Sequence, residues 1–211
     1  MSDRESPPFI VLSGVERARA SDPAGTSALT LTQCQHVARA VLDTLETDHL
    51  ILRHRRVDEA AIYRQLWTER DLRVPPHRRM SPEGRPTEED IAAQIRAERE
   101  ESRPGILAVE RKGRADVIGY CGLIFHGNGS PGEPELAYEL LRAAHGCGYA
   151  TEACRAVVTW ARDLGYRRLW AGVWEWNVAS RRVLEKLGFR ETCRVEPDSV
   201  HGENLLTVRE L

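Results

Sequence analysis

The chain lacks any long run of apolar residues, and it has almost no excess of charge. No apolar segment is long enough to cross a bilayer, and the residues after Met1 do not have the charged-then-apolar layout of a signal peptide. The 30 basic and 32 acidic residues leave a formal net charge of -2. Broad binding to nucleic acid or to an anionic membrane is therefore not expected, and we predict a cytoplasmic protein.

Paired cysteines are also missing, although the chain has five cysteines. They occur without a CxxC motif and without the spacing of zinc ligands. This pattern predicts reduced thiols in a cytoplasm, no disulfide framework and no metal site. The five are Cys34, Cys121, Cys147, Cys154 and Cys193.

Length and composition predict one globular domain with an appendage. A chain of 211 residues, 41% of them hydrophobic, buries roughly 70% of the surface that its unfolded form exposes. Residues 1–28 mix proline, glycine and serine without a sustained period, so we expect partial disorder there. Residues 29–46 have apolar side chains at three- and four-residue steps, which predicts an extra helix that forms a homodimer contact or covers one sheet edge. Residues 47–211 are the main domain.

The rest of the chain is organised around residues 135–189. Apolar residues alternate over 135–140, which predicts a strand with one apolar face. A turn with two glycines, Gly146 and Gly148, follows and runs directly into an amphipathic helical pattern. A turn of this kind presents unpaired N–H groups at the positive end of the helix dipole and favours phosphate oxygens, so a diphosphate fits.

Two common nucleotide-binding motifs are absent from this turn. It has neither G-x-G-x-x-G with an acidic partner for the ribose nor G-x-x-x-x-G-K-[ST]. A second strand over 169–174 follows instead, and then a short helix with Asn177 as its N-cap and Gly188 as its C-terminal cap.

Together these segments resemble the GNAT superfamily of N-acetyltransferases, specifically its RimJ/RimL-like branch of ribosomal-protein N-terminal acetyltransferases. The resemblance rests on Y-E-L at 138–140, H-G-C-G-Y-A-T-E-A at 145–153 and N-V-A-S-R-R-V-L-E-K-L-G-F at 177–189, and it begins near Thr47. It implies the GNAT fold of the α/β (α+β) class. That fold has a mixed, mostly antiparallel sheet of six to seven strands, helices on both faces, and fourth and fifth strands that splay apart.

The resemblance also implies acetyl-CoA as cosubstrate, without a metal, and direct acetyl transfer to a primary amine. The pantetheine arm would lie between the splayed strands and the diphosphate on the glycine turn. The family has Gln or Arg where this chain has His145, a departure that contacts made mainly by the backbone tolerate. Asn177 also has a structural role as an N-cap. The residues expected at the cosubstrate are Leu140, Leu141, Gly146, Cys147, Gly148, Tyr149, Ala150, Thr151 and Asn177.

Acetyl transfer needs a neutral amine, a polarised thioester carbonyl and a protonated leaving thiolate. We expect the backbone N–H near Leu140 to polarise the carbonyl. Glu139 is the first candidate for the base and Glu135 the second, with a solvated strand carboxylate as the alternative. Many family members have a tyrosine where this chain has Leu184, so Ser180 becomes the candidate that protonates the thiolate, with a capping role as the alternative.

Further candidates are weaker. Asp198, expected in the loop after the sixth strand, is another possible base by position. Cys147 and Cys154 are interpreted as packing residues, because no His and acid constellation accompanies them.

The proline- and arginine-rich loop over 70–87 would help to wall the acceptor pocket in the family. A plain solvated loop is the favoured alternative, because charged loops are usually only loops. Three tryptophans near the fifth strand favour an aromatic core or a subunit contact, with Trp176 facing the acceptor cleft as the functional alternative. The residues concerned are Trp67, Arg73, His77, Arg78 and Arg79 around the loop, and Trp170, Trp174 and Trp176.

Two other classes of function stay open beside the enzyme. One is a regulator that binds acyl-CoA without turnover, which the missing tyrosine favours. The other is a protein-interaction module whose turn binds no nucleotide. For the enzyme, the sequence is compatible with a protein N-terminus, a polyamine, an amino acid or an antibiotic amine as acceptor.

Overall fold

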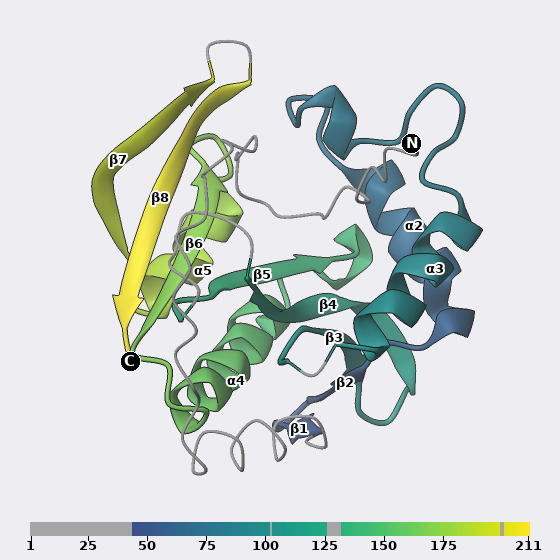
Figure 1. Cartoon of the computed structure of the whole chain (residues 1–211), viewed down its shortest axis with the longest axis horizontal. Coiled ribbons are helices and arrows are strands. Elements are labelled where there is room, and N and C mark those ends of the chain that lie inside the picture. Colours follow the sequence, from purple (N-terminus) through teal and green to yellow (C-terminus); the bar gives the residue numbers. More distant parts are fainter. Residues whose placement is uncertain (1–43, 102, 126–131, 199–200) are drawn as a thin grey trace, which may run out of the picture.

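The computed structural model describes residues 44–101, 103–125, 132–198 and 201–211. These residues form one sheet of eight strands with helices on both faces (Figure 1). The strands are β1 (Leu45–Glu46), β2 (Leu50–His54), β3 (Ile106–Arg111), β4 (Asp116–Ile124), β5 (Glu135–Leu140), β6 (Arg168–Trp174), β7 (Arg190–Asp198) and β8 (Gly202–Glu210). The helices are α2 (Ala60–Glu69), α3 (Glu88–Arg99), α4 (Tyr149–Asp163) and α5 (Val178–Lys186), with short 3-10 turns η1 (Val57–Glu59), η2 (Pro76–Arg78) and η3 (Arg142–Ala144).

The strand order is β1-β2-β3-β4-β5-β6-β8-β7. Every neighbouring pair is antiparallel except β5 and β6, which are parallel. The predicted mixed, mostly antiparallel sheet with helices on both faces is therefore confirmed. The predicted fourth and fifth strands are β5 and β6, because a short strand precedes the predicted first one.

That additional strand, β1, corrects two predictions. It brings the count to eight strands instead of six to seven, and it replaces the end of the helix predicted over 29–46. Leu45 pairs with Leu52, and Glu46 pairs with Ile51. Pairing with the edge of β2 satisfies backbone groups that a helix would have satisfied internally. Residues 1–28 and the rest of the predicted helix lie outside the described residues.

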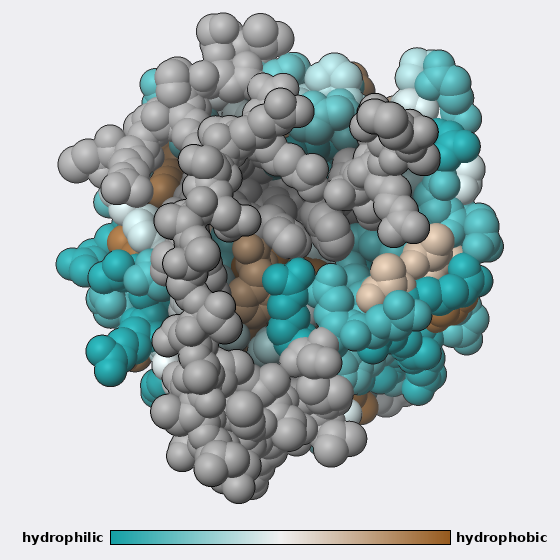
Figure 2. Space-filling model, in the orientation of Figure 1, coloured by the Kyte–Doolittle hydropathy of each residue, from teal (hydrophilic) through white to brown (hydrophobic). Residues whose placement is uncertain are grey.

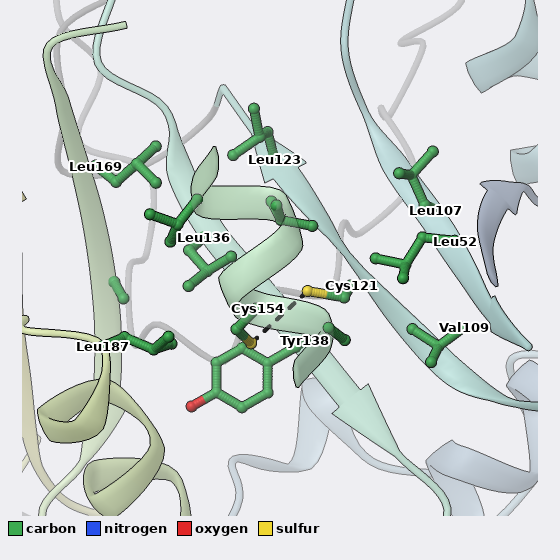
Figure 3. Close-up of a cluster of buried hydrophobic side chains, with 14 of the residues drawn as sticks. Leu52, Leu107, Val109, Cys121, Leu123, Leu136, Tyr138, Cys154, Leu169 and Leu187 are labelled. Carbon is green, nitrogen blue, oxygen red and sulfur yellow. Dashed lines mark hydrogen bonds between the residues drawn. The ribbon is translucent and has the colours of Figure 1, made fainter. Parts of the chain in front are cut away.

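Alternation along the central strands divides the apolar side chains between two cores. In β3, Leu107 and Val109 belong to the core under α4 and α5, whereas Ala108 belongs to the core under α2 and α3. Figure 3 shows the first core, in which Tyr138 of β5 and Cys154 of α4 lie side by side. The sheet is therefore covered on both faces, and strand β5 contributes to both cores.

Helix α4 is amphipathic and is tied to the start of the sheet by one carboxylate. The Glu152 carboxylate accepts from the Thr47 hydroxyl at 2.5 Å and from the His49 N–H at 2.8 Å. Helix α3 begins with a capping box, in which the Thr87 side chain accepts the Asp90 N–H and the Asp90 side chain accepts the Thr87 N–H.

The described helices include none with the length and apolarity of a membrane span. In the view of Figure 2, the coloured surface over α2 and α3 is mainly hydrophilic. Two large apolar side chains in the described residues are highly exposed, Leu72 and Val178.

Candidate functional site

The parallel ladder between β5 and β6 ends almost where it begins. The two strands share one residue pair, Glu135 with Trp170, and the Trp170 N–H donates to the Pro134 carbonyl at 3.0 Å. The Gly172 N–H, next along the same side of β6, donates to Glu135 Oε1 at 3.0 Å. Within the described residues no further ladder pair joins these strands. They therefore separate beyond this point, as the predicted splay requires.

Glu135 holds the point at which the strands separate. Its side chain is almost fully buried, with 3% of the residue exposed. Its carboxylate accepts the backbone N–H that a β5 carbonyl would accept in a continued parallel ladder. Glu135 does not line the adjoining cavity. We therefore assign this second candidate for the base a positioning role.

The far end of β5 presents a backbone N–H to the gap. The Leu141 N–H donates to the Ile118 carbonyl of β4 at 2.8 Å. Because the N–H groups of successive strand residues point in opposite directions, the Leu140 N–H points toward the gap. The Leu140 carbonyl on that side accepts from His145 Nε2 at 2.8 Å. Of the two leucines predicted to offer backbone groups, only Leu140 has its N–H on the gap side.

A cavity of about 840 Å³ occupies the gap between β5 and β6. Its walls come from the end of β5, the glycine turn and start of α4, the end of β6, helix α5 and the end of α2 with its loop. Both candidate catalytic residues, Glu139 and Ser180, line it. Of the nine residues predicted at the cosubstrate, the cavity is lined by Leu140, Gly146, Gly148, Tyr149, Ala150, Thr151 and Asn177, and not by Leu141 or Cys147.

The glycine turn leaves several amides without a helical partner. Gly146 and Gly148 have φ values of 76° and 85°, a left-handed conformation that glycine adopts without strain. Gly148 is the N-cap of α4, no side chain caps this end, and the first intrahelical bond runs from the Glu152 N–H to the Gly148 carbonyl. The three preceding helical N–H groups therefore lie at the positive end of the helix dipole, beside the cavity.

Two cations of α5 line the same cavity, one helical turn apart. Arg182 and Lys186 are both exposed, and neither forms an ion pair or side-chain hydrogen bond within the described residues. Like charges at this spacing repel each other by a few tenths of a kcal/mol. Their neighbour Arg181 differs, because its guanidinium is bound to Glu191 at 2.8 Å. The pair thus adds positive potential to the wall that faces the turn.

The start of α5 positions a serine hydroxyl against a buried phenol. Asn177 caps the helix by accepting the Ser180 N–H at 3.1 Å, an arrangement typically worth about 1 kcal/mol. The Ser180 Oγ lies 2.5 Å from the Tyr138 hydroxyl. Burial, first of all, raises the pKa of Tyr138 well above its usual value. Leu184, at the position where the resemblance would place a tyrosine, is buried in the core.

The sequence did not single out Tyr138 as a functional residue. Its alternation in β5 indicated only an inward-facing position. The contact with Ser180 joins residues that are 42 positions apart, and it depends on how α5 packs against β5. The one signal that the sequence offered was a tyrosine in the strand predicted to border the site for which Ser180 was a candidate.

Glu139 lies on the opposite wall and is held by a buried ion pair. Its two oxygens accept from Arg70 Nε at 2.8 Å and Arg70 Nη2 at 2.6 Å, and one of them also accepts from the Tyr120 hydroxyl at 3.1 Å. Arg70 stacks over Trp67, 4.2 Å from the ring centroid. Burial and then the charge of Glu139 raise the pKa of Tyr120 well above its usual value. Glu139 is therefore not the solvated strand carboxylate of the alternative reading.

Of the basic residues predicted to lie at the acceptor pocket, Arg73 lines the cavity. Its guanidinium lies 4.2 Å from the ring centroid of Trp176. It also donates to Asp71, and these hydrogen bonds lower the pKa of Asp71 to about 2. Arg78 is buried, and its carbonyl accepts from Arg70. The other members of the predicted set, Trp67, His77, Arg78 and Arg79, do not line the cavity.

The tryptophans in and just after β6 have different surroundings, with Trp170 and Trp174 in the strand and Trp176 in the turn that follows it. Trp174 and Trp176 stack in parallel, with centroids 6.2 Å apart, and both line the cavity. Trp176 Nε1 donates to the His201 carbonyl at 2.9 Å. Trp170 does not line the cavity, and its Nε1 donates to Glu133 at 2.8 Å. The aromatic-core reading thus fits buried Trp174, and Trp176 forms part of the cavity wall.

Three weaker expectations have mixed outcomes. Cys154 packs in the core 3.7 Å from the Cys121 sulfur, and burial raises its pKa. Cys147 was expected to pack as well, but it is exposed, because the turn carries it outward. Asp198 ends strand β7 instead of lying in a loop, and its side chain is outside the described residues.

Among the described residues there is no cluster of three or more His, Cys, Asp or Glu side chains that would hold a metal ion.

Comparison with known proteins agrees with this geometry. Over 57 residues the chain is 46% identical to a probable N-acetyltransferase YjcK of Bacillus subtilis, a match that covers 26% of this chain. The match spans about a third of that relative's length, 32%. A ribosomal-protein-S5-alanine acetyltransferase from Vibrio fischeri has a similar structure, with a TM-score of 0.59 and 16% identity over 80% of this chain and 97% of that one.

A structure of Mycobacterium smegmatis RimJ in complex with CoA-disulfide is also similar. Its TM-score is 0.56, with 22% identity over 76% of this chain and 81% of that one. At these identities the two structures show the shared fold. Residues 49–190, which include the whole cavity wall from α2 to α5, match the acetyltransferase (GNAT) domain family. The chain belongs to this family.

Proposed function

We propose that the protein transfers an acetyl group from acetyl-CoA directly to a primary amine. One observation carries the proposal. A single cavity joins the uncapped, glycine-flanked start of α4 to the gap-facing Leu140 N–H of β5. The first feature suits phosphates, and the second suits a developing negative charge on a carbonyl oxygen.

The residues present fit acetyl-CoA, which supplies an acetyl group activated as a thioester. The amides of Gly146 to Thr151 would hold the diphosphate, and Arg182 and Lys186 would add charge on the facing wall. No side-chain cap competes for these amides. The gap side of β5 would hold the amide-bearing arm, since its backbone is unpaired by β6 beyond Glu135.

Three groups of this chain would serve the reaction. The Leu140 N–H would polarise the carbonyl, and Asn177 would keep Ser180 at the side of the leaving sulfur. Glu139 is the proposed base, acting through water. A carboxylate has about four acceptor sites, and Arg70 and Tyr120 occupy three of those of Glu139, so one is left for a water or an amine. The same bonds fix its orientation.

A protein N-terminus or a small-molecule amine is the proposed acceptor. The structural neighbour from Vibrio fischeri is named for acetylating an alanine of a ribosomal protein, which makes alanyl peptides the first choice for a test. The stacked Trp174 and Trp176 offer a rigid apolar wall for the residue that carries the amine.

A non-catalytic regulator that binds acyl-CoA is the second candidate. Leu184 in place of the usual phenol and the ion-paired state of Glu139 favour it. The regulator would bind acetyl-CoA and would release no free CoA with any amine.

The experiment has two stages, binding and then turnover. Acetyl-CoA should raise the melting temperature and give a saturable calorimetric isotherm. Release of free CoA should then be screened with alanyl and seryl peptides, spermidine and free amino acids. Absence of binding contradicts the proposal as a whole, whereas binding without turnover across the panel favours the regulator.

We further infer a cytoplasmic location and a homodimer. Cys121 and Cys154 are buried free thiols whose sulfurs lie 3.7 Å apart without a disulfide, which supports a reducing compartment. Fractionation of tagged cells and sedimentation equilibrium would test the two inferences.

A further inference from the structure

The hydroxyl groups of Tyr138 and Ser180 are hydrogen-bonded to each other, and either of them can be the donor. Tyr138 has one O–H and two acceptors in reach, the Ser180 carbonyl at 3.1 Å and the Ser180 Oγ at 2.5 Å. Tyr138 and Ser180 are both buried, yet both line the cavity. Figure 3 shows the Tyr138 hydroxyl pointing away from Cys121.

Two arrangements of the hydrogens satisfy these distances. In the first, Tyr138 donates to the Ser180 carbonyl and Ser180 donates to the Tyr138 oxygen, so that no donor points into the cavity. In the second, Tyr138 donates to Ser180 Oγ, which frees the serine hydrogen to point into the cavity. The Ser180 carbonyl lies one turn before Leu184 inside α5, so a helical N–H is available to it in both arrangements.

We propose that Tyr138 is a positioning residue that turns the Ser180 hydroxyl toward the sulfur of the cosubstrate. This proposal rests on the proposed function. A sulfur that gains negative charge in the cavity favours the second arrangement, because only that arrangement offers it a donor. The main-chain bond from Ser180 to the Asn177 cap fixes where the serine stands, and Tyr138 fixes which way its hydrogen points.

The phenol acts as a donor and keeps its proton. Burial raises its pKa well above the usual value, with the neighbouring Cys154 as a smaller contribution, so a phenolate at this position is unfavourable. No covalent bond forms between the protein and the acetyl group, and Ser180 keeps its hydrogen while it stabilises the leaving sulfur. The amine gives one proton through water to Glu139, and the thiolate takes up one proton from solvent, so the transfer as a whole neither consumes nor releases a proton relative to the neutral amine.

The test uses the complex with CoA and needs no acceptor. With CoA labelled by carbon-13 beside its sulfur, the NMR shift of that carbon as a function of pH reports the pKa of the bound thiol. A hydrogen bond from Ser180 stabilises the thiolate, so we expect the bound pKa to rise by about one unit in Tyr138→Phe and in Ser180→Ala. The double variant should show no larger rise than Ser180→Ala alone, because both changes remove the same bond.

Turnover gives a second measurement. Once an acceptor is found, Tyr138→Phe should lower kcat roughly 10- to 100-fold with little change in the KM for acetyl-CoA. Tyr63→Phe is the matched control, since Tyr63 is another buried tyrosine with one hydrogen-bonded hydroxyl, to Glu59 at 3.3 Å, away from the cavity. It should leave the pKa of bound CoA and kcat unchanged.

Several results would overturn the inference. An unchanged thiol pKa in Ser180→Ala, which leaves the phenol in place, is sufficient by itself, even where Tyr138→Phe does not fold. Losses that multiply in the double variant would show two independent roles. A wild-type protein that fails to bind CoA would contradict the proposed function instead, so the two failures are distinguishable.

Discussion

The two walls of the cavity treat charge in opposite ways. On the α5 wall, Arg182 and Lys186 have no partner within the described residues, and the amides at the start of α4 are uncapped. On the α2 wall, Arg70 and Glu139 neutralise each other, and Arg73 binds Asp71. Positive groups without partners on a cavity wall indicate that the ligand there is an anion. A wall whose charges are already paired with each other gives no such information about ligand charge, so it can select an acceptor only by its shape. The cosubstrate is therefore easier to infer from this structure than the acceptor is.

The largest expected effect comes from a negative charge introduced into the glycine turn. Gly148→Glu should weaken acetyl-CoA binding at least about 1,000-fold, equivalent to about 4 kcal/mol. A carboxylate would stand where the phosphates are expected, and calorimetry would measure the loss. Gly165→Glu is the matched control, because Gly165 has a φ of 88° and open space around it at the other end of α4. Tight binding by the Gly148 variant would contradict the site.

The next largest effect is expected from removing one member of the ion pair between Arg70 and Glu139. Arg70→Met should lower the free energy of unfolding by about 3 kcal/mol, because it leaves the Glu139 charge buried without its partner. Adding Glu139→Gln should restore most of that stability, as urea titration would show. If Glu139 is the base, turnover in the double variant stays low although stability returns. Full turnover at saturating acceptor would remove Glu139 from the mechanism.

A smaller effect tests the unpaired cations. Arg182→Ala and Lys186→Ala should each weaken acetyl-CoA binding about fivefold at low salt, and less at high salt. Arg181→Ala, which removes a cation already bound to Glu191, should have no effect. Repeating the titration with 3′-dephospho-CoA shows which phosphate the cations contact. Equal losses in all three variants would mean that the α5 wall acts only through its total charge.

The smallest effect concerns the attachment of α4 to the sheet. Burial alone would raise the pKa of Glu152, but the hydrogen bonds from Thr47 and His49 outweigh it and lower that pKa. The stabilisation is therefore present above the ordinary pKa of 4.5 and is lost as the pH falls through the lowered value. Glu152→Gln should cost about 1 kcal/mol at neutral pH. In thermal melts this cost should fade in acid, and a constant difference down to low pH would contradict this reading.

Much of the fold could be predicted because it depends on local patterns. Alternation identified β5, and two glycines before an amphipathic run identified the turn and α4. These features need no knowledge of the partner strands. Strand β1 escaped because its two residues are too short to show any period, and the apolar spacing before them suggested a helix.

The chemistry of the cavity was less predictable for the opposite reason. The contacts of Glu139 with Arg70, of Tyr138 with Ser180 and of Glu135 with Gly172 join residues 69, 42 and 37 positions apart. Each of these three contacts depends on the register of a strand or on the packing of a helix. A local sequence pattern shows neither the register nor the packing. The sequence indicated Glu139 and Ser180 as candidates, but it did not indicate the groups that hold them.

One consequence follows from the brief pairing of β5 with β6. The sheet consists of two half-sheets, one of strands β1 to β5 and one of strands β6, β8 and β7. They are joined by one ladder pair, Glu135 with Trp170, and by the hydrogen bond from the Gly172 N–H to the Glu135 side chain. Rotation of one half-sheet relative to the other would therefore break few sheet hydrogen bonds. A molecule bound in the cavity between β5 and β6 would contact both half-sheets, so it should slow hydrogen exchange at Gly172 and in β8 alike.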